Sequence, residues 1–261
     1  MGVIKQFLKI ISSSGYSYTS ERYRDSFLEN NCDSSQKKYF EHLQRRIFCF
    51  WTGKNEMSKN RLDSLTSLRE KSGVEIVLVT PENLDQFILS DFPLHKGFKY
   101  LSAVHKSDYL RCYFMHHYGG GYTDIKSAAN NWESSFKKLE KQSDKWITGY
   151  REIGERGVAR VEHPNLAIDL IKNWQYLIGN GAYICRSYTP FTEEWYNELH
   201  RRMDIFYPKL VAFPGNIMGD NDGYPIPWTE ILGQIFHPLC LKYFEKIIYS
   251  NKIKPVLSNY R

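Results

Sequence analysis

Along the middle of the chain, short apolar runs alternate with stretches in which apolar residues recur at helical spacing and so would share one face of a helix. The run 47–51 is rich in β-branched and aromatic residues and is followed by Thr52-Gly53, which is typical of a buried strand that enters a turn. A helix is expected next, because Ser58 can cap its start, leucines recur on one face, and Gly73 can end it in the left-handed conformation. A second strand is expected over 75–79. This alternation predicts an α/β fold with a mostly parallel central sheet flanked by helices, whose ligands bind beyond the carboxyl ends of the strands.

The pattern farther along the chain extends this alternation. Thr80-Pro81 is expected to open a helix, because proline is favoured at the first helical position. Further elements are expected as a helix over about 102–117, a strand from Tyr122, strands over 146–150 and 181–185, and a helix from Thr189-Pro190 to about Arg202. The sequence contains no internal repeat.

The first 45 residues differ in composition from the rest of the chain. Apolar residues recur at helical spacing within 1–11, and the segment 12–38 is rich in Ser, Asn and charged residues. We expect a helical and polar N-terminal arm over 1–45 and one domain over 46–261, with helical additions at both ends. The apolar series can pack on the core or lie on a membrane surface. It is not expected to be a signal peptide, because no small-residue cleavage site comes after it.

Composition narrows the class of protein. A chain of 261 residues with 42% hydrophobic residues can bury a large core, and no apolar run is long enough to span a bilayer. Five scattered cysteines without a CxxC pair cannot close a complete set of disulfides, which favours a reducing cytoplasm. The formal net charge of +6 favours phosphate-bearing partners. No basic run or nucleic-acid signature accompanies this charge, so we expect no nucleic-acid partner.

The stretch from Ser107 to Lys126 contains the candidate chemistry. Asp108 and Arg111 are three residues apart on the expected helix, so a carboxylate and a guanidinium share one face and can bind hydroxyls and phosphates. Three glycines then allow a tight turn or a close approach of the backbone, and the strand after them ends at Asp124. Each of these features alone is more often a surface salt bridge or a simple turn.

Taken together, these residues resemble the sugar-binding region with the Asp-X-Asp motif found in glycosyltransferase family 32 and in the glucosylating domain of the large clostridial toxins. The shared form is Ser-Asp, two residues, Arg, and then Gly-Gly-X-Tyr-X-Asp-X-Asp. The matching residues are Ser107, Asp108, Arg111, Gly119, Gly120, Tyr122 and Asp124.

The resemblance implies a GT-A-like fold, a nucleotide-sugar donor that is usually a UDP-sugar, and transfer with retention. It implies a bacterial enzyme that adds a hexose or N-acetylhexosamine to a saccharide or lipid-linked saccharide acceptor in capsule, O-antigen or lipopolysaccharide synthesis. The donor-binding residues implied are Trp51, Thr52, Gly53, Asp108, Arg111, Gly120, Gly121, Tyr122, Asn180, Trp228 and Thr229. Trp51 would stack on the base, and Asp108 and Arg111 would hold hydroxyls of the sugar.

The chain departs from the motif at its second acid. Lys126 stands where the family has a carboxylate that binds a divalent cation, and an ammonium cannot ligate Mn²⁺ or Mg²⁺. One hypothesis is that Lys126 acts with Asp124 in catalysis and supplies the positive charge beside the departing diphosphate, so that the enzyme needs no metal. The alternative is that Asp124 holds a cation with Asp220, Asp222 or His237. No organic cofactor is expected.

A loop over about 213–230 is dense in carboxylates and turn formers. C-terminal loops in related transferases close over the donor, often through a tryptophan, and Trp228 and Thr229 resemble that element. We therefore expect a lid here.

Two other functions remain open at this stage. The chain could be a toxin-like transferase acting on a protein, or a sugar-nucleotide binding module without turnover, since Lys126 breaks the motif. We expect a cytoplasmic protein with possible peripheral contact with the inner membrane.

Overall fold

The computed structural model describes residues 15–29 and 43–258. The apolar series within 1–11 and much of the expected arm lie outside these described residues. Within the described part of the arm, two short 3₁₀ helices, Ser20–Tyr23 and Phe27–Glu29, pack against the helices α5 (Pro164–Lys172) and α7 (Gly233–Lys242).

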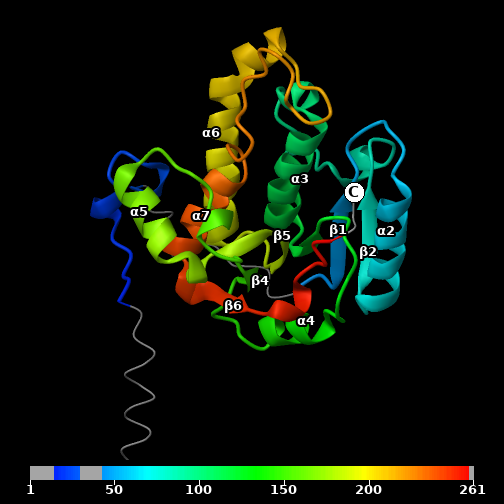
Figure 1. Cartoon of the computed structure of the whole chain (residues 1–261), viewed down its shortest axis with the longest axis horizontal. Helices are drawn as coiled ribbons and strands as arrows, with labels where there is room; N and C mark the ends of the chain where they lie inside the picture. The colour runs from blue at the N-terminus through cyan, green and yellow to red at the C-terminus, as the bar shows by residue number, and fades with distance from the viewer. Residues whose placement is uncertain (1–14, 30–42, 259–261) are drawn as a thin grey trace, which may run out of the picture.

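A six-stranded sheet forms the centre of the fold, in the order β2-β1-β3-β5-β4-β6 (Figure 1). Its strands are β1 (Arg46–Phe50), β2 (Glu75–Val79), β3 (Gly120–Thr123), β4 (Ile147–Arg151), β5 (Ile178–Cys185) and β6 (Ile247–Tyr249). β1 is parallel to β2 and β3, and β4 is parallel to β6, whereas β5 is antiparallel to both of its neighbours. All strands except β5 therefore run in one direction, which confirms the predicted α/β class with a mostly parallel, GT-A-like sheet.

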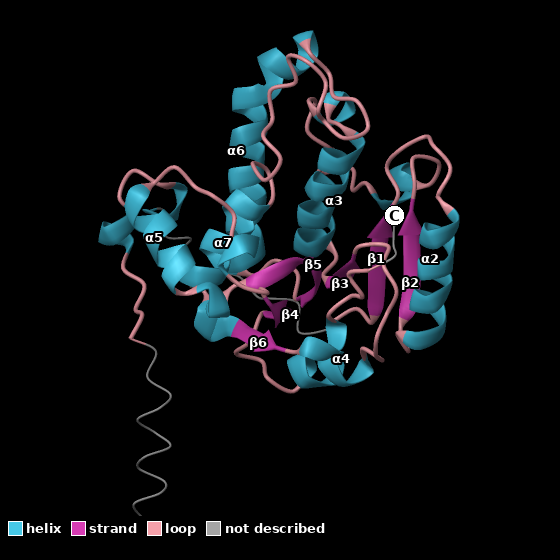
Figure 2. Ribbon diagram, in the orientation of Figure 1, coloured by secondary structure: helices cyan, strands magenta, loops and turns pink. Residues whose placement is uncertain are grey.

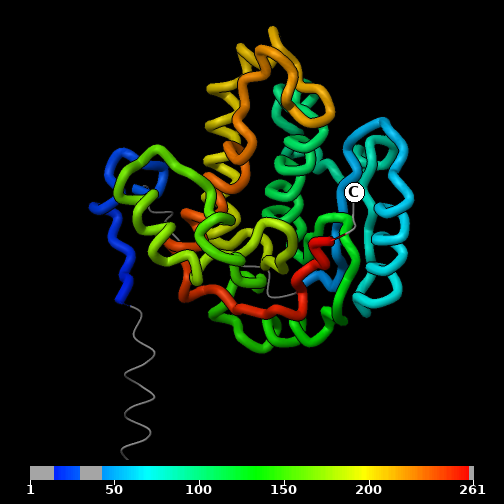
Figure 3. Tube along the Cα trace, viewed as in Figure 1, coloured from blue at the N-terminus to red at the C-terminus, as the bar shows by residue number. Residues whose placement is uncertain are grey.

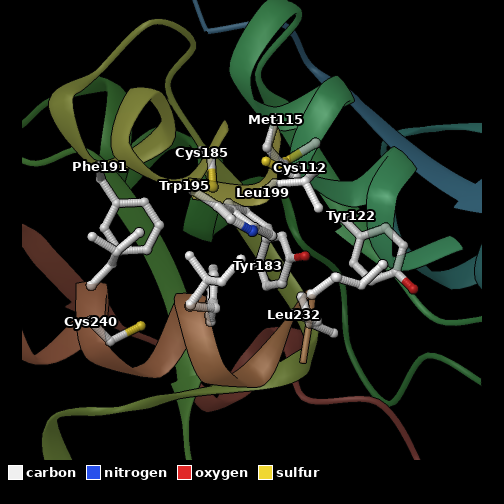
Figure 4. Packing of buried hydrophobic residues seen from close by; sticks show 14 of the residues in the cluster. Cys112, Met115, Tyr122, Tyr183, Cys185, Phe191, Trp195, Leu199, Leu232 and Cys240 are labelled. Atoms are coloured by element: carbon white, nitrogen blue, oxygen red, sulfur yellow. The ribbon is translucent and has the colours of Figure 1, made fainter. Parts of the chain in front are cut away.

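Helices cover both faces of this sheet (Figure 2). The remaining helices are α2 (Lys59–Lys71), α3 (Ala103–His117), α4 (Glu133–Glu140) and α6 (Pro190–Ala212). Successive strand residues point to opposite faces, so that Phe48 belongs to the core cluster that includes residues of α3, α6 and α7, while its neighbour Ile47 belongs to the cluster that includes residues of α4. Figure 4 shows the larger core, where Tyr183 of β5 meets Trp195 of α6.

Local sequence signals explain where the predicted helices begin. Ser58 accepts a hydrogen bond at its side chain from the Arg61 amide at the start of α2, and Ser102 accepts one from the His105 amide at the start of α3. Gly73 adopts a positive φ of 68° after α2, as its residue type indicated. These starts and the β2 bounds agree with the sequence prediction.

Other predicted elements differ from the structure. The segment after Thr80-Pro81 forms a turn and a short 3₁₀ helix, Leu84–Phe87, in place of an α-helix. The Asn83 side chain accepts from the Thr80 amide and donates to the Leu78 carbonyl, which closes a turn there instead. The helix predicted to stop near Arg202 continues to Ala212, because Met203 and Leu210 keep its apolar face buried. The elements α4, α5 and β6 were not predicted.

No helix in the described part of the chain is long and apolar enough to cross a membrane. The cysteines that the structure describes, Cys49, Cys112, Cys185 and Cys240, are buried and not in disulfides.

Candidate functional site

A pocket of about 620 Å³ opens at the edge of the sheet where β1 and β3 end. We call it the strand-end pocket. Its walls come from the segment after β1, the first half of α3, the segment after β3, and the loop 213–230 that comes after α6. Figure 3 shows the course of these segments along the backbone. Among its lining residues are the predicted site residues Trp51, Thr52, Gly53, Arg111, Tyr122, Asp124, Lys126 and Trp228. The fold therefore brings together residues from four separate parts of the sequence.

Asp124 lies at the centre of the polar contacts in this pocket. Its Oδ1 accepts a hydrogen bond of 2.6 Å from the Tyr122 hydroxyl and lies 3.3 Å from the Arg111 guanidinium. Its Oδ2 accepts a 2.8 Å hydrogen bond from the Lys126 ammonium. Arg111 also pairs with Asp108 at 3.2 Å and lies over the Tyr122 ring. Two acids and two cations thus form one connected network.

The pKa values of the two acids are shifted in opposite directions. Burial raises the pKa of Asp124, but Arg111 and Lys126 outweigh burial and hold this pKa below its ordinary value. Burial also raises the pKa of Asp108, and here Arg111 does not compensate, so the pKa of Asp108 stays above its ordinary value. Of the two acids, Asp124 is therefore the one whose ionised form the neighbouring cations favour more strongly, which suits a group that holds a cation or a hydroxyl near the reacting centre.

The segment after β1 forms a second part of the pocket wall. The Trp51 indole donates to the Asn55 carbonyl at 2.8 Å, which fixes the ring beside the pocket. The Thr52 hydroxyl donates to the Ala103 carbonyl at the start of α3. Together these hydrogen bonds tie the end of β1 to α3 and place an aromatic face within the same pocket as Asp124.

Some predicted donor-binding residues lie outside the lining. The Gly120 and Gly121 positions serve sheet packing: a Cβ at Gly120 would lie 2.9 Å from the Arg46 carbonyl, and one at Gly121 would meet Ile47. The structure thus places these two glycines at close-approach positions beside β1 and outside the pocket lining, and their contact with a donor stays a prediction. Asn180 lies next to the network, where its carbonyl accepts from Arg111 at 3.1 Å.

Two further predicted donor-binding residues, Asp108 and Thr229, also lie outside the pocket lining. Asp108 reaches the network through Arg111. Thr229 lies outside the lining, and its carbonyl accepts from the Leu232 and Gln234 amides at the start of α7.

The predicted metal ligands do not come together. His237 is fully buried in α7, and its Nδ1 accepts a hydrogen bond from the Ala159 amide. Asp220 and Asp222 are exposed on loop 213–230 and do not line the pocket. The described residues contain no group of three or more His, Cys, Asp or Glu that could hold a metal ion. Asp124 already contacts two cations, so the donors present here do not fit a divalent-cation site of the usual kind.

Sequence reasoning missed several residues of the pocket. Arg61 donates from its guanidinium to the Ile125 carbonyl at 2.7 Å and adds a positive charge to the wall. Ile217 and Met218 line the pocket from loop 213–230, and Ser107, named above as a motif residue without an assigned role, lines it from α3. Arg61 could have been predicted from the sequence, because it lies in the first turn of the helix expected after the first strand and so near the end of that strand. The contribution of Ile217 and Met218 depends on how their loop folds back.

The sequence was also compared with known proteins. Residues 5–143 match the family described as capsular polysaccharide synthesis protein, and this range includes β1, Trp51 and the whole segment from Ser107 to Lys126. No curated protein matches the sequence. Among solved structures, the chain is similar to one titled PaToxG Glycosyltransferase, with a TM-score of 0.42, 12% identity, and coverage of 76% of this chain and 68% of that one. That likeness is too remote to identify a function. Because the family match extends over more than half of its length, the chain belongs to the capsular polysaccharide synthesis protein family.

Proposed function

We propose that this capsular polysaccharide synthesis protein is a glycosyltransferase. It takes a hexose or N-acetylhexosamine from a UDP-sugar and transfers it, with retention, to a saccharide acceptor of the growing capsule. The observation that carries the proposal is the joint placement of Asp124, Arg111 and Lys126 in one pocket with Trp51. A site for a sugar nucleotide needs an aromatic face for the base, cations for the diphosphate and acids for the sugar hydroxyls.

The positions of the aromatic and charged side chains in the pocket suggest how the donor would bind. Trp51 would stack on the uracil at the end of β1, while Arg111, paired with Asp108, would hold hydroxyls of the sugar in the same pocket. The diphosphate would then lie between them, beside Lys126. Negative charge accumulates on the diphosphate as its bond to the sugar breaks, and a cation fixed nearby stabilises that charge without reorganising.

In this proposal Lys126 supplies the positive charge that a divalent cation held by the second acid of the motif would otherwise supply. Its ammonium has three donors, so it can keep its hydrogen bond to Asp124 and still donate to a phosphate oxygen. The enzyme would then turn over its donor in the presence of a chelator. No step of the proposed reaction is assigned to a metal, because the donors around Asp124 do not fit one.

The network also favours one route to retention. Both oxygens of Asp124 are engaged, by Tyr122 and Arg111 on one side and Lys126 on the other, which makes Asp124 a poor nucleophile. In the route we favour, the acceptor oxygen bonds to the anomeric carbon on the face that the diphosphate leaves. The departing phosphate oxygen takes the proton of the acceptor hydroxyl.

The acceptor is proposed from the family alone. The family description names capsular polysaccharide synthesis, so we favour a capsule saccharide over an O-antigen or lipopolysaccharide chain. A lipid-linked form of this acceptor and work at the cytoplasmic membrane face would agree with the net charge of +6.

The test is release of UDP from a panel of UDP-sugars by the purified protein, with a mixture of simple saccharide acceptors, in EDTA and in Mn²⁺. We expect release that Asp124→Asn abolishes and that Asp144→Asn leaves unchanged, since Asp144 is an exposed acid paired with Lys145. Saturable binding of UDP-sugars without any release would favour the binding-module alternative. If neither binding nor release occurred with any donor, the transferase proposal would be wrong.

A further inference from the structure

Loop 213–230 is fixed to the start of α3 by backbone hydrogen bonds. The amides of Ala103 and Val104, the first two residues of α3, donate to the carbonyls of Asn216 and Ile217 at 3.2 Å each. Amides at this position have no partner within the helix, so the loop satisfies donors that would otherwise need water or a side chain. The loop is therefore a part of the structure of α3 as well as a wall of the pocket.

Tyr224 provides a second attachment from the same loop. Its hydroxyl accepts a hydrogen bond from the Ser102 amide at 3.2 Å and lies 2.8 Å from Nδ1 of His105. The Tyr224 and His105 rings also stack, with centroids 5.6 Å apart and planes inclined by 21°. Side-chain stacking and hydrogen bonding thus act at one point, directly beside the two backbone hydrogen bonds.

Burial favours the neutral form of His105 beside this contact. His105 is 1% exposed, and burial keeps its pKa below the ordinary value in spite of Asp108, Glu230 and the backbone carbonyls of Pro227 and Trp228 that face it. A neutral imidazole can accept at Nδ1 from the Tyr224 hydroxyl. The hydroxyl in turn accepts from the Ser102 amide, which makes a continuous chain of hydrogen bonds from α3 to the loop.

The loop is braced internally, so a change at Tyr224 reaches the pocket wall. The Asn216 side chain accepts hydrogen bonds from the amides of Met218 and Gly219, and the Asn216 amide donates to the side chain of Asn221. Ile217 and Met218, between these anchors, line the strand-end pocket. Neither His105 nor Tyr224 lines it.

We propose that His105 and Tyr224 are positioning residues that fix loop 213–230 against α3 and so set the place of Ile217, Met218 and Trp228 at the pocket. What the pocket binds rests on the function proposed above. The attachment itself rests only on the contacts between α3 and the loop, so it is tested separately from activity.

The first experiment compares Tyr224→Phe with Tyr249→Phe. Both variants lose one hydroxyl, but the Tyr249 hydroxyl donates to the Tyr176 carbonyl at 2.8 Å, in the sheet and away from the pocket lining. Hydrogen exchange of the amides of Ala103 and Val104 is the readout. We expect exchange there to speed up about three- to tenfold in Tyr224→Phe, from the loss of about one net hydrogen bond, and to stay unchanged in Tyr249→Phe.

Kinetics give the second readout. Under the proposed function the loop would contact the donor before and during transfer, so its displacement should raise the donor KM about three- to tenfold with little change in kcat. His105→Asn keeps a polar atom near the position of Nδ1 while removing the ring, and it should retain most of the exchange protection. His105→Ala should lose that protection.

Each outcome decides the proposal. Unchanged exchange at Ala103 and Val104 in Tyr224→Phe would overturn it, and so would an equal increase across the whole chain, which is the signature of general destabilisation. If Tyr224→Phe does not fold, the comparison of His105→Asn with His105→Ala carries the same test. Local exchange that increases as expected in a protein without transferase activity would support the attachment and refute only the proposed function.

Discussion

Removal of the Lys126 ammonium tests the most unusual feature of the site. Lys126→Ala deletes the charge and leaves the backbone after β3 in place, while Lys126→Arg keeps a cation with a different shape. In the native site the Lys126 and Asp124 side chains are 13% and 21% exposed and their charged atoms are 2.8 Å apart. An ammonium this shielded from water is held in one place before the donor arrives, which is the condition for strong electrostatic catalysis.

The decrease in kcat expected for Lys126→Ala can be estimated in two ways. A unit charge about 4 Å from a phosphate oxygen, at an effective dielectric constant of about 20, contributes about 4 kcal/mol, and each 1.36 kcal/mol is about tenfold in rate, which gives a ceiling of about 10³-fold. Removing one preorganised donor from a charged transition state costs about 10²- to 10³-fold in kcat. We therefore expect Lys126→Ala to lower kcat by about 10²- to 10³-fold and Lys126→Arg to recover part of that loss.

The assay is single-donor UDP release measured in EDTA, with Lys137→Ala as the matched control. Lys137 is an exposed lysine paired with Glu133 outside the strand-end pocket, so its removal should leave the rate unchanged. The reasoning would be refuted if Lys126→Ala kept kcat within threefold of the native enzyme. Activity of the native enzyme only with Mn²⁺ would also refute the role of Lys126, although the protein would remain a transferase.

The same structure supports three other predictions. Trp51→Ala should weaken UDP binding by about tenfold or more in calorimetry, and Trp51→Phe by less, because a base stacked on an aromatic ring contributes about 1–3 kcal/mol; equal affinities would exclude Trp51 as the stacking face. Burial raises the pKa of Asp124, but Arg111 and Lys126 hold it below the ordinary value, so the ion pairs of Asp124 stabilise the fold above about pH 4 and are lost as the pH falls through the lowered pKa. The difference in free energy of unfolding between native protein and Asp124→Asn in urea should thus be constant from about pH 8 to 5 and shrink below about pH 4, and a difference unchanged at about pH 3 would contradict this. Gly120→Ala should lower the free energy of unfolding by about 1–3 kcal/mol, because φ at Gly120 is 82° and the added Cβ would meet the Arg46 carbonyl, while Gly15→Ala, with open space around it, should change it by less than about 0.5 kcal/mol.

Sequence patterns predicted the part of the fold formed by β1, α2 and β2, where the local signals for each element agree with the overall alternation of strands and helices. β1, α2 and β2 carry apolar runs, a serine cap and a glycine stop in the expected order, so their bounds were predicted closely. The segment after Thr80-Pro81 failed because the Asn83 side chain competes for the backbone groups that a helix would use. The later part of α6 was missed because the predicted helix ended near Arg202, although the buried face continues to Leu210 and the helix includes Pro208.

The site shows the same division between residues near a strand end and residues on loops. Trp51 and Asp124 come directly after β1 and β3, which are parallel neighbours, so their common edge was predictable from the order of the elements. Gly120 and Gly121 belong to the same motif, yet the structure uses them to bring β3 close to β1, and a motif alone does not tell a ligand contact from a packing contact. His237 shows the same limit: a histidine near a candidate loop lies in the core, where its Nδ1 accepts a hydrogen bond from the Ala159 amide.

The replacement of the second acid by Lys126 is consistent with the charge balance of the site. A carboxylate with a bound divalent cation contributes one net positive charge beside the first acid, and a lysine contributes the same charge without a metal. In this chain Asp108, Asp124, Arg111 and Lys126 together are neutral before the donor binds, and Asp124 links both cations. Losing Lys126 would leave one uncompensated acid beside a diphosphate, which explains why the lysine is buried against Asp124 instead of extending into solvent. On this argument the departure from the motif keeps the electrostatics of the site and changes only the group that supplies the charge.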